Sequence, residues 1–412
     1  MINKARLAKT FAEMEKIGRD SDGGVSRLAF GAADWQGRDY VKALLRQAGL
    51  ALREDSFGNL IARRAGTDPA APVVMLGSHI DSVPSGGNYD GVVGVLAAIE
   101  VLQCLADAKA QHANPIEVVV FMAEESSRFG VATLGSKAFC GKLTREALER
   151  YRDKDGVSLA EALAQRGFDA QRVAEAKYAM PIKAFLELHI EQGKVLEVAK
   201  AQLGIVSGIA APSRFTIVVN GQADHSGATP MDLRHDALAA AAEIILQVEK
   251  LAKAAADGGI VGTVGVIEAK PGAMNVIPGR VEMGVDIRGI GQESKLAVVA
   301  ALHAAIEEIT RRRGVAAEIS VVSEEAPVKL AASMIELLTT LCHEQGYRHR
   351  LLPSGAGHDA MHLAALAPTG MLFIPCRDGI SHNPAEHAEM ADIAAGADIL
   401  LAAVKKLAAV RI

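Results

Sequence analysis

Two histidine and carboxylate clusters in this chain stand where apolar segments stop. His79 and Asp81 follow the apolar run "APVVMLGS", and the pair Glu124 and Glu125 follows "VVVFMA". Imidazole and carboxylate groups at neighbouring strand ends provide nitrogen and oxygen ligands, a set that suits Zn²⁺ or Mn²⁺. An acidic pair directly after a buried run has no packing rationale. The pattern therefore favours a metal centre.

Three more residues of the same types lie at the ends of predicted elements. Asp90 opens a helical stretch, His189 lies near the end of "AFLELHIEQG", and His382 lies within "GISHNPAEH". One carboxylate can bridge two ions through its two oxygens, and the remaining groups would then fill two sites. Two-metal sites activate a bridging water at neutral pH and polarise a carbonyl.

The acidic residues beside these ligands have further expected roles. One glutamate of the pair Glu124 and Glu125 can bind metal while its neighbour, pointing elsewhere, transfers a proton. Asp81, two residues after His79, is placed to accept the second ring N–H of that histidine and so orient it.

Simpler interpretations compete with the metal centre. An isolated histidine is usually a core or surface residue, which is the interpretation for His112, His303, His343 and His349. It is harder to explain by accident that four places at the ends of predicted elements, at His79, Glu124, His189 and His382, carry such groups. Neither a phosphate-binding G-x-x-x-x-G-K-[ST] loop nor a G-x-S-x-G nucleophile motif occurs. "GAGHDA" fits a dinucleotide-binding pattern only weakly, since no convincing strand is predicted before it.

The elements that must position these residues alternate between strand and helix in the first half of the chain. Strands are predicted over 72–81 and 115–125, and helices over 90–110 and 157–166. This alternation is typical of an α/β domain with a mostly parallel sheet, in which ligands lie at the carboxyl ends of the strands.

The pattern changes near residue 210. A strand ends at Asn220 and Gly221, a pair typical of hairpin turns. Helices are predicted over about 235–255 and 292–313. Alternating strands are predicted over 262–270, 280–290 and 316–325, as in an α+β unit with an antiparallel sheet. After about 328 the α/β pattern returns, with a strand over 369–375 and a closing helix over 388–409. We therefore expect a discontinuous catalytic domain, residues 1–209 and 328–412, and an inserted domain, residues 210–327.

Composition excludes several function classes. Half of the residues are hydrophobic, 23% are charged and the net charge is −5, so no basic surface for nucleic acid is expected. No apolar stretch is long enough to span a membrane, and the N-terminal segment lacks the apolar region of a signal peptide. The four cysteines contain no C-x-x-C pair, which favours a reducing, cytoplasmic compartment without disulfides.

Motifs along nearly the whole chain resemble those of the hydantoinase/carbamoylase amidase family. They are "GSHIDSVPSGGNYDG", "EESSRFGVATLGSKAF", "ELHIEQGKVLE", "ADHSGATPMDLRHDAL", "NVIPGRVEMGVDIR", "SGAGHDA" and "GISHNPAE", in this order. The family includes N-carbamoyl-L-amino acid hydrolases, one type of β-ureidopropionase and allantoate amidohydrolases. It is part of the clan of di-metal aminoacylases and carboxypeptidases, so the resemblance implies a di-metal exopeptidase-like catalytic domain.

The resemblance implies roles for individual residues. His79, Asp90 and His189 would bind one ion, while Asp90, Glu125 and His382 would bind the other, with Zn²⁺ or Mn²⁺ expected and Co²⁺ or Ni²⁺ able to substitute. Glu124 would be the general base and later the acid. The implied substrate contacts are His225, which would also stabilise the oxyanion, Asn275 and Arg288 at the carboxylate, and Gln192, Arg214, Gly357 and His358.

The inserted domain would form the homodimer contact and act as a lid. His225, Asn275 and Arg288 lie in this domain, so either domain closure or a partner subunit must bring them to the metals. The chain departs from the family at Ser126, where glycine is usual. Arg377 and Asp378 lie where family members vary and would tune side-chain preference.

The expected reaction is hydrolysis of the carbamoyl group of an N-carbamoyl-L-amino acid or related ureido acid, releasing the amino acid, ammonia and carbon dioxide. "IAAPSRF" and "HSGATPMD" look closer to the carbamoyl-amino-acid branch than to the allantoate branch. Allantoate amidohydrolase is the alternative within the family. A metal-stabilised binding protein without turnover is the alternative from another class, and the intact Glu124 argues against it.

Overall fold

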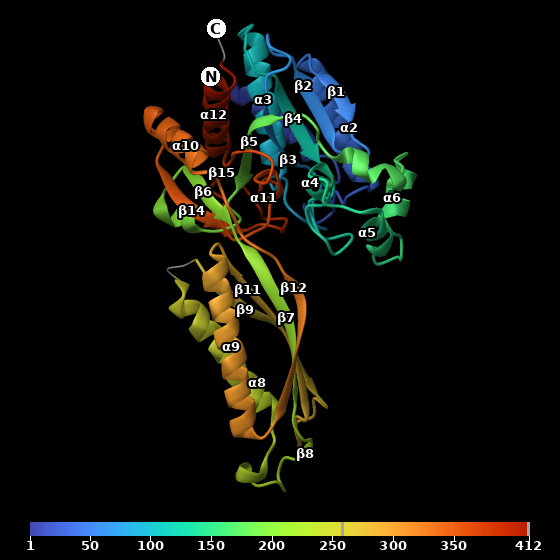
Figure 1. Ribbon diagram of the computed structural model, residues 1–412, viewed down its shortest axis with the longest axis vertical. Coiled ribbons are helices and arrows are strands. Elements are labelled where there is room, and N and C mark those ends of the chain that lie inside the picture. Colours follow the sequence, from blue (N-terminus) through green and yellow to red (C-terminus); the bar gives the residue numbers. More distant parts are fainter. Residues whose placement is uncertain (257–258, 410–412) are drawn as a thin grey trace. The chain divides into compact units, whose positions relative to one another are not determined.

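The computed structural model describes residues 1–256 and 259–409, which divide into two compact units (Figure 1). The first unit comprises residues 1–207, 330–352 and the chain from Gly357 on. The second comprises residues 208–329 and 353–356. The second unit is thus inserted between two parts of the first.

A mixed sheet forms the centre of the first unit. Its order is β1-β2-β4-β3-β5-β15-β6, with β14 also paired to β6. The four central strands are mutually parallel, whereas the pairs β1–β2, β2–β4 and β15–β6 are antiparallel. The bounds of these strands are β1 Ala51–Glu54, β2 Leu60–Arg64, β3 Val73–His79, β4 Ile116–Phe121, β5 Ile182–Ile190, β6 Leu203–Ile209, β14 His349–Ser354 and β15 Thr369–Ile374.

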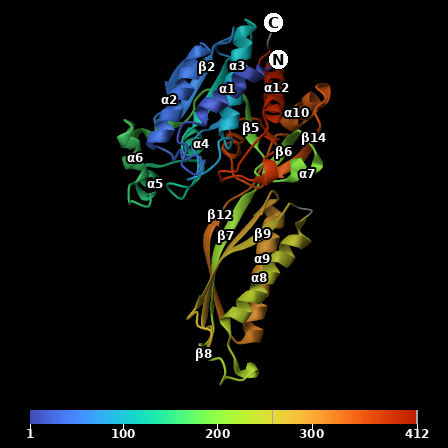
Figure 2. The same cartoon turned by 180° about the vertical axis from the view of Figure 1, so that it is seen from behind.

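Helices cover this sheet, and α3 and α12 contribute many of the buried residues of its core. The side chains of α3 are apolar on almost every side, as expected for a helix buried between other elements, and it packs on β3, β5 and α12. Helix α1 packs in turn on α3 (Figure 2). The helices of this unit are α1 Lys4–Met14, α2 Ala32–Gln47, α3 Val92–Asp107, α4 Leu134–Phe139, α5 Arg145–Arg150, α6 Leu159–Gln165, α7 Val195–Ala199, α10 Ala332–Glu344, α11 Ala360–Leu363 and α12 Met390–Leu407, with short 3₁₀ turns at η1 Ala170–Ala176 and η4 Arg377–Gly379.

The second unit is an antiparallel sheet with two helices on one face. The sheet order is β12-β7-β11-β9, and the inward side chains of these strands form one core with α8 and α9. A two-stranded ribbon, β8 with β10, continues beyond the end of β7. The elements are β7 Ala211–Asn220, β8 Asp224–His225, η2 Met231–Leu233, α8 Ala237–Ala254, β9 Val261–Lys270, β10 Val276–Ile277, β11 Arg280–Gly289, α9 Gln292–Arg313, β12 Ala316–Glu324 and β13 Val328–Lys329.

The predicted fold class is confirmed, with a largely parallel central sheet and a separate antiparallel one. Two local predictions are wrong. Asn220 and Gly221 do not close a hairpin, because β7 pairs with the distant strands β11 and β12. Gly221 instead permits a close approach: a Cβ there would lie 2.1 Å from the carbonyl oxygen of His235. A strand, β14, does precede "GAGHDA", but the helix after it, α11, has only four residues.

Among residues 1–256 and 259–409, no helix combines the length and the apolar character that crossing a bilayer requires.

Candidate metal centre

The parallel strands β4, β3 and β5 are neighbours, so their carboxyl ends meet at one edge of the sheet. His79 is the last residue of β3, His189 is the penultimate residue of β5, and Glu124 follows β4 by three residues. Asp90 lies just before α3, which packs against β3 and β5. The topology therefore gathers side chains that are up to 110 residues apart (189 − 79) in the sequence.

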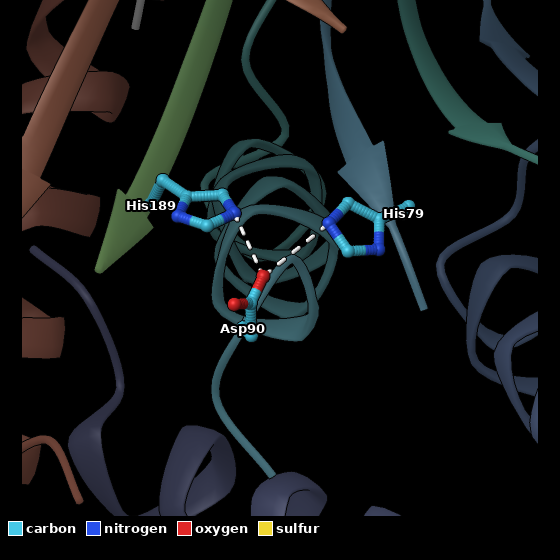
Figure 3. A group of neighbouring side chains, drawn as sticks. All are labelled: His79, Asp90 and His189. Atoms are coloured by element: carbon cyan, nitrogen blue, oxygen red, sulfur yellow. Dashed lines mark ion pairs between the residues drawn. The ribbon is translucent and has the colours of Figure 1, made fainter. Parts of the chain in front are cut away.

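His79, Asp90 and His189 form the first group of converging side chains (Figure 3). Oδ1 of Asp90 lies 3.2 Å from Nε2 of His189 and 3.5 Å from Nε2 of His79. Both imidazoles are buried. Gly91 makes this convergence sterically feasible, because a Cβ at that position would lie 2.3 Å from Nε2 of His79, and its φ of +66° is one that glycine adopts without strain.

Asp90, Glu125 and His382 form a second group around the other oxygen of Asp90. Nε2 of His382 lies 3.2 Å from Oδ2 of Asp90 and 3.2 Å from Oε1 of Glu125. Asp90 thus presents Oδ1 to one group and Oδ2 to the other. This is the arrangement in which one carboxylate can bridge two ions.

The hydrogen bonds that the two buried histidines make at Nδ1 indicate which ring nitrogen would bind a metal. Nδ1 of His79 lies 3.1 Å from the carbonyl oxygen of Asp81, and Nδ1 of His189 lies 2.9 Å from that of Ile190. A carbonyl only accepts, so in the neutral form of each ring Nδ1 carries the proton and Nε2 presents a lone pair. The backbone N–H of Gly91, which donates to Nε2 of His189 at 3.1 Å, agrees with this tautomer.

Asp81 positions the acidic pair with its side chain. Its two carboxylate oxygens accept the backbone N–H groups of Glu124 at 3.2 Å and Glu125 at 3.0 Å. The distance from Nδ1 of His79 to the Asp81 carboxylate is 3.6 Å, longer than the 3.1 Å to its carbonyl. The second ring N–H of His79 therefore points mainly to the main-chain carbonyl of Asp81.

Glu124 points toward the first group without being a member of it. Its Oε2 lies 3.6 Å from Nε2 of His79. Burial raises the pKa of Glu124 well above its ordinary value; His79 opposes the rise, and the carboxylates of Glu125 and Asp359 add to it. A carboxylate with a raised pKa accepts a proton at neutral pH more readily than an ordinary glutamate does.

The donor set and its charge fit divalent cations. Nε2 of His79 is buried and, among the described residues, has no hydrogen-bond partner. Burial would raise the pKa of Asp90, but His189 and the other histidines around it hold this pKa well below its ordinary value. Hydrogen bonds to Asp90 and Glu125 raise the pKa of His382 to about 11. The carboxylates thus require positive charge between them, which a metal ion with N and O ligands can supply.

Sequence reasoning missed two glutamates beside the ligands. Glu187 lies two residues before His189 on the same strand, and its oxygens accept hydrogen bonds from Ser78 Oγ at 2.7 Å and from the Ala360 N–H at 3.0 Å. A charged residue within the apolar strand "AFLELHI" was the available signal. Glu386 accepts the N–H groups of residues 89 and 90, and nothing local in "NPAEH" indicated this contact.

The predicted substrate contacts in the first unit lie at different places relative to the metal ligands. Gln192 donates from Nε2 to Oδ2 of Asp90 at 2.6 Å, so it lies at the centre. His358 is buried, with its ring centroid 4.4 Å from that of His189 and 5.7 Å from that of Phe373. Gly357 directly precedes it and has only Met361 near the place of a Cβ. His358 thus packs behind a ligand.

The predicted contacts in the second unit fall into two groups at opposite ends of β11. Arg214 and Arg288 share the carboxylate of Asp286, with N–O distances of 2.8 to 3.0 Å. His225 lies on β8, where it pairs with Val276, and the N–H of Ser226 donates to the carbonyl of Asn275. The ribbon lies beyond the Arg280 end of β11. Arg280 is eight residues from Arg288 (288 − 280), which is about 26 Å along an extended strand.

His225 is set up as a hydrogen-bond donor. Its Nδ1 accepts the backbone N–H groups of Gly227 at 3.1 Å and Ala228 at 3.2 Å. The proton of the neutral ring therefore lies on Nε2, which faces away from these partners.

Comparisons with known proteins agree with this geometry. Residues 75–406 match the peptidase family M20/M25/M40. The chain is 44% identical over 409 residues to an N-carbamoyl-L-amino acid amidohydrolase from Geobacillus stearothermophilus, covering 99% of both chains. It is 35% identical to the allantoate amidohydrolase of Escherichia coli, again covering 99% of both. The crystal structure of a hydantoinase/carbamoylase family amidase from Burkholderia multivorans superposes with a TM-score of 0.92 at 37% identity, covering 99% of this chain and 98% of that one.

Proposed function

We propose that this chain, which belongs to the peptidase family M20/M25/M40, is a metal-dependent amidohydrolase that cleaves the carbamoyl C–N bond of N-carbamoyl-L-amino acids. The observation that carries the proposal is Asp90, whose two oxygens face two separate groups of nitrogen and oxygen ligands beside the buried Glu124. The named relatives and the expected ligand pattern support the same activity.

We assign two divalent ions to the centre. His79, Asp90 and His189 would hold one, and Asp90, Glu125 and His382 would hold the other. Zn²⁺ or Mn²⁺ suits these ligands, and Co²⁺ or Ni²⁺ would substitute. When bound, such ions polarise the carbamoyl carbonyl and lower the pKa of water.

The protein's own residues supply the proton transfers and the binding. Glu124 accepts a proton from the attacking water and returns it to the leaving nitrogen, a role that its raised pKa favours. Nε2 of His225 donates to the oxygen on which negative charge develops. Arg288 pairs with the substrate carboxylate, and Asn275 and Gln192 donate hydrogen bonds around it. The products are the amino acid, ammonia and carbon dioxide.

A second copy of the chain would complete the site. A carbamoyl amino acid spans about 7 Å, roughly two residues of extended chain. Arg288 and His225 of one chain are separated by most of the length of β11, so one substrate cannot contact both. Closure of the inserted unit alone therefore does not meet the expectation that it delivers His225, Asn275 and Arg288 together. We propose a homodimer in which His225 and Asn275 come from the partner.

Two alternatives to this activity differ in their support. Allantoate hydrolysis is the second candidate activity, supported by the 35% identity to the Escherichia coli enzyme. A binding protein without turnover fits less well, because Glu124 is present and placed beside the ligands.

All four cysteines are free thiols, which favours a cytoplasmic location.

The direct test is ammonia release from a panel of N-carbamoyl-L-amino acids and allantoate, with Mn²⁺ or Zn²⁺ present and Glu124→Gln as the blank. The proposal expects metal-dependent release from carbamoyl amino acids at rates well above the blank. No release from any ureido acid by the metal-loaded protein would reject it.

A further inference from the structure

The face of the second unit's sheet that α8 and α9 leave open contains a hollow of about 570 Å³ beside Arg288. Its walls are mostly apolar or small, with Val261, Val266, Val322 and the glycines 265 and 284, and two threonines, Thr216 and Thr263, add hydroxyl groups. A β-bulge between Gly284 and Val285 shifts the register of β11 against β9 at this place. The bulge and the two missing side chains together hollow out a surface that would otherwise be filled.

One end of the hollow is charged, and its charges are arranged for a single carboxylate. Asp286 accepts from Nε and Nη2 of Arg288 at 2.9 and 3.0 Å and from Nε of Arg214 at 2.8 Å. Nη1 of Arg288 donates to the carbonyl of Gly355 at 3.0 Å. These contacts use three of the five N–H groups of Arg288 and leave one on each terminal nitrogen, the number that a bidentate carboxylate pair needs. The three side chains carry a net charge of +1.

We propose that this hollow is the subsite for the substrate's side chain, and that the preferred substrates are N-carbamoyl derivatives of large apolar amino acids. The inference rests on the proposed function. A carboxylate on Arg288 places the substituent of the adjacent α-carbon against the hollow. The valine side chains there offer no hydrogen bond and only Thr216 and Thr263 carry hydroxyls, so a ureido or charged substituent would lose more hydrogen bonds to water than it regains. Allantoate, whose substituent is a second ureido group, is therefore a poor substrate.

The first experiment compares kcat/KM of the metal-loaded enzyme for N-carbamoyl derivatives of glycine, L-leucine, L-methionine and L-aspartate, and for allantoate. Burial of each methylene is worth ~0.8 kcal/mol, or about 4-fold in kcat/KM. Because the hollow is open on one side, we expect the leucine and methionine derivatives to exceed the glycine derivative by at least ~10-fold. Equal values for glycine and leucine, or a higher value for allantoate or aspartate, would overturn the subsite.

The second experiment fills the hollow. A Cβ at Gly265 would meet no atom within 4 Å, so Gly265→Leu adds bulk there without a clash. It should lower kcat/KM for the leucine derivative about 10-fold and leave the glycine derivative within 2-fold. Val218→Leu, which adds bulk on the same open face but outside the hollow, is the matched control and should change neither.

A charge provides an independent variant in case Gly265→Leu folds poorly. Val266 is 56% exposed, so Val266→Asp should fold, and Val266→Thr is its near-isosteric control. The aspartate should lower kcat/KM for the leucine derivative at least 10-fold relative to the threonine. If neither filling nor charging the hollow changes the ratio of leucine to glycine derivatives, the side chain binds elsewhere. If the unmutated, metal-loaded enzyme hydrolyses no ureido acid at all, the proposed function itself is rejected.

Discussion

Glu386 and Asp90 are 296 positions apart, yet the backbone N–H of Asp90 donates to Oε1 of Glu386 at 3.1 Å. The same oxygen accepts the N–H of Tyr89 at 2.9 Å. Oε2 accepts from Ser381 Oγ at 2.9 Å, and that hydroxyl also lies 3.0 Å from Oδ2 of Asp90. Glu386 thus ties the loop that bears Asp90 to the loop that bears His382.

Glu386→Ala should therefore weaken metal binding at the group that contains His382. Loss of an outer-shell partner of this kind costs about 10- to 100-fold in metal affinity. Glu386→Gln keeps an oxygen for the two N–H groups and should lose less. Titration of the metal-free variants with Mn²⁺, followed calorimetrically, measures both. Wild-type affinity in a folded Glu386→Ala protein would show that the loops hold their places without it.

Glu124→Gln should retain metal and substrate but lose turnover. Glutamine is nearly isosteric with glutamate but cannot accept the proton, so kcat should fall about 10²-fold or more. Steady-state kinetics and metal content are measured on the same sample. A variant with nearly wild-type kcat would assign the proton transfer to another group.

Arg288→Ala should mainly raise KM, because the carboxylate contact exists in both ground and transition states. Loss of a charge-assisted bidentate pair costs about 1.5–3 kcal/mol, roughly 10- to 150-fold in kcat/KM. Arg280→Ala is the matched control, since Arg280 lies on the same strand and pairs with Glu282 at 2.9 Å. If kcat/KM stays unchanged for every carbamoyl amino acid tested, Arg288 does not hold the carboxylate.

Asp286→Asn should also raise KM, though by less than Arg288→Ala. The variant keeps the arginine but weakens the carboxylate that holds Nε and Nη2 in place. A wild-type KM in Asp286→Glu, together with a raised KM in Asp286→Asn, would identify the negative charge as the feature that orients Arg288. A normal KM in Asp286→Asn would mean that the Gly355 carbonyl suffices.

Mixing two inactive variants tests whether His225 acts in the partner's site. A dimer of one Glu124→Gln chain and one His225→Ala chain has one doubly altered site and one intact site if His225 crosses over. Random exchange of subunits then restores about a quarter of the wild-type sites. Should the mixture stay as inactive as its components after proven exchange, His225 works within its own chain.

Much of the fold and of the candidate site is readable from the sequence. His79, His189 and the glutamate pair follow apolar runs whose strand character is unambiguous, and parallel neighbours bring their ends together by topology alone. The segments predicted as helices over 90–110 and 292–313 become α3 and α9 with ends shifted by at most three residues. Periodicity of this kind is set locally, so it survives folding.

The rest depends on contacts that no local pattern encodes. The link between Glu386 and the Asp90 loop joins residues 296 positions apart. Asp81 meets His79 through its main-chain carbonyl, while its carboxylate accepts the N–H groups of Glu124 and Glu125. The separation of Arg288 from His225 also required the register of β11, since their motifs are only tens of residues apart. The distance between two such residues depends on how their strands pair, and this pairing is known only from the folded sheet.

The most direct measurement of the central claim is metal content and ammonia release on one sample. The protein is stripped with a chelator, checked for residual metal, and titrated with Mn²⁺ or Zn²⁺ while hydrolysis of an N-carbamoyl-L-amino acid is followed. We predict no activity in the stripped protein and full recovery as two equivalents bind, with Co²⁺ or Ni²⁺ also effective. Full activity in a demonstrably metal-free preparation would contradict the account.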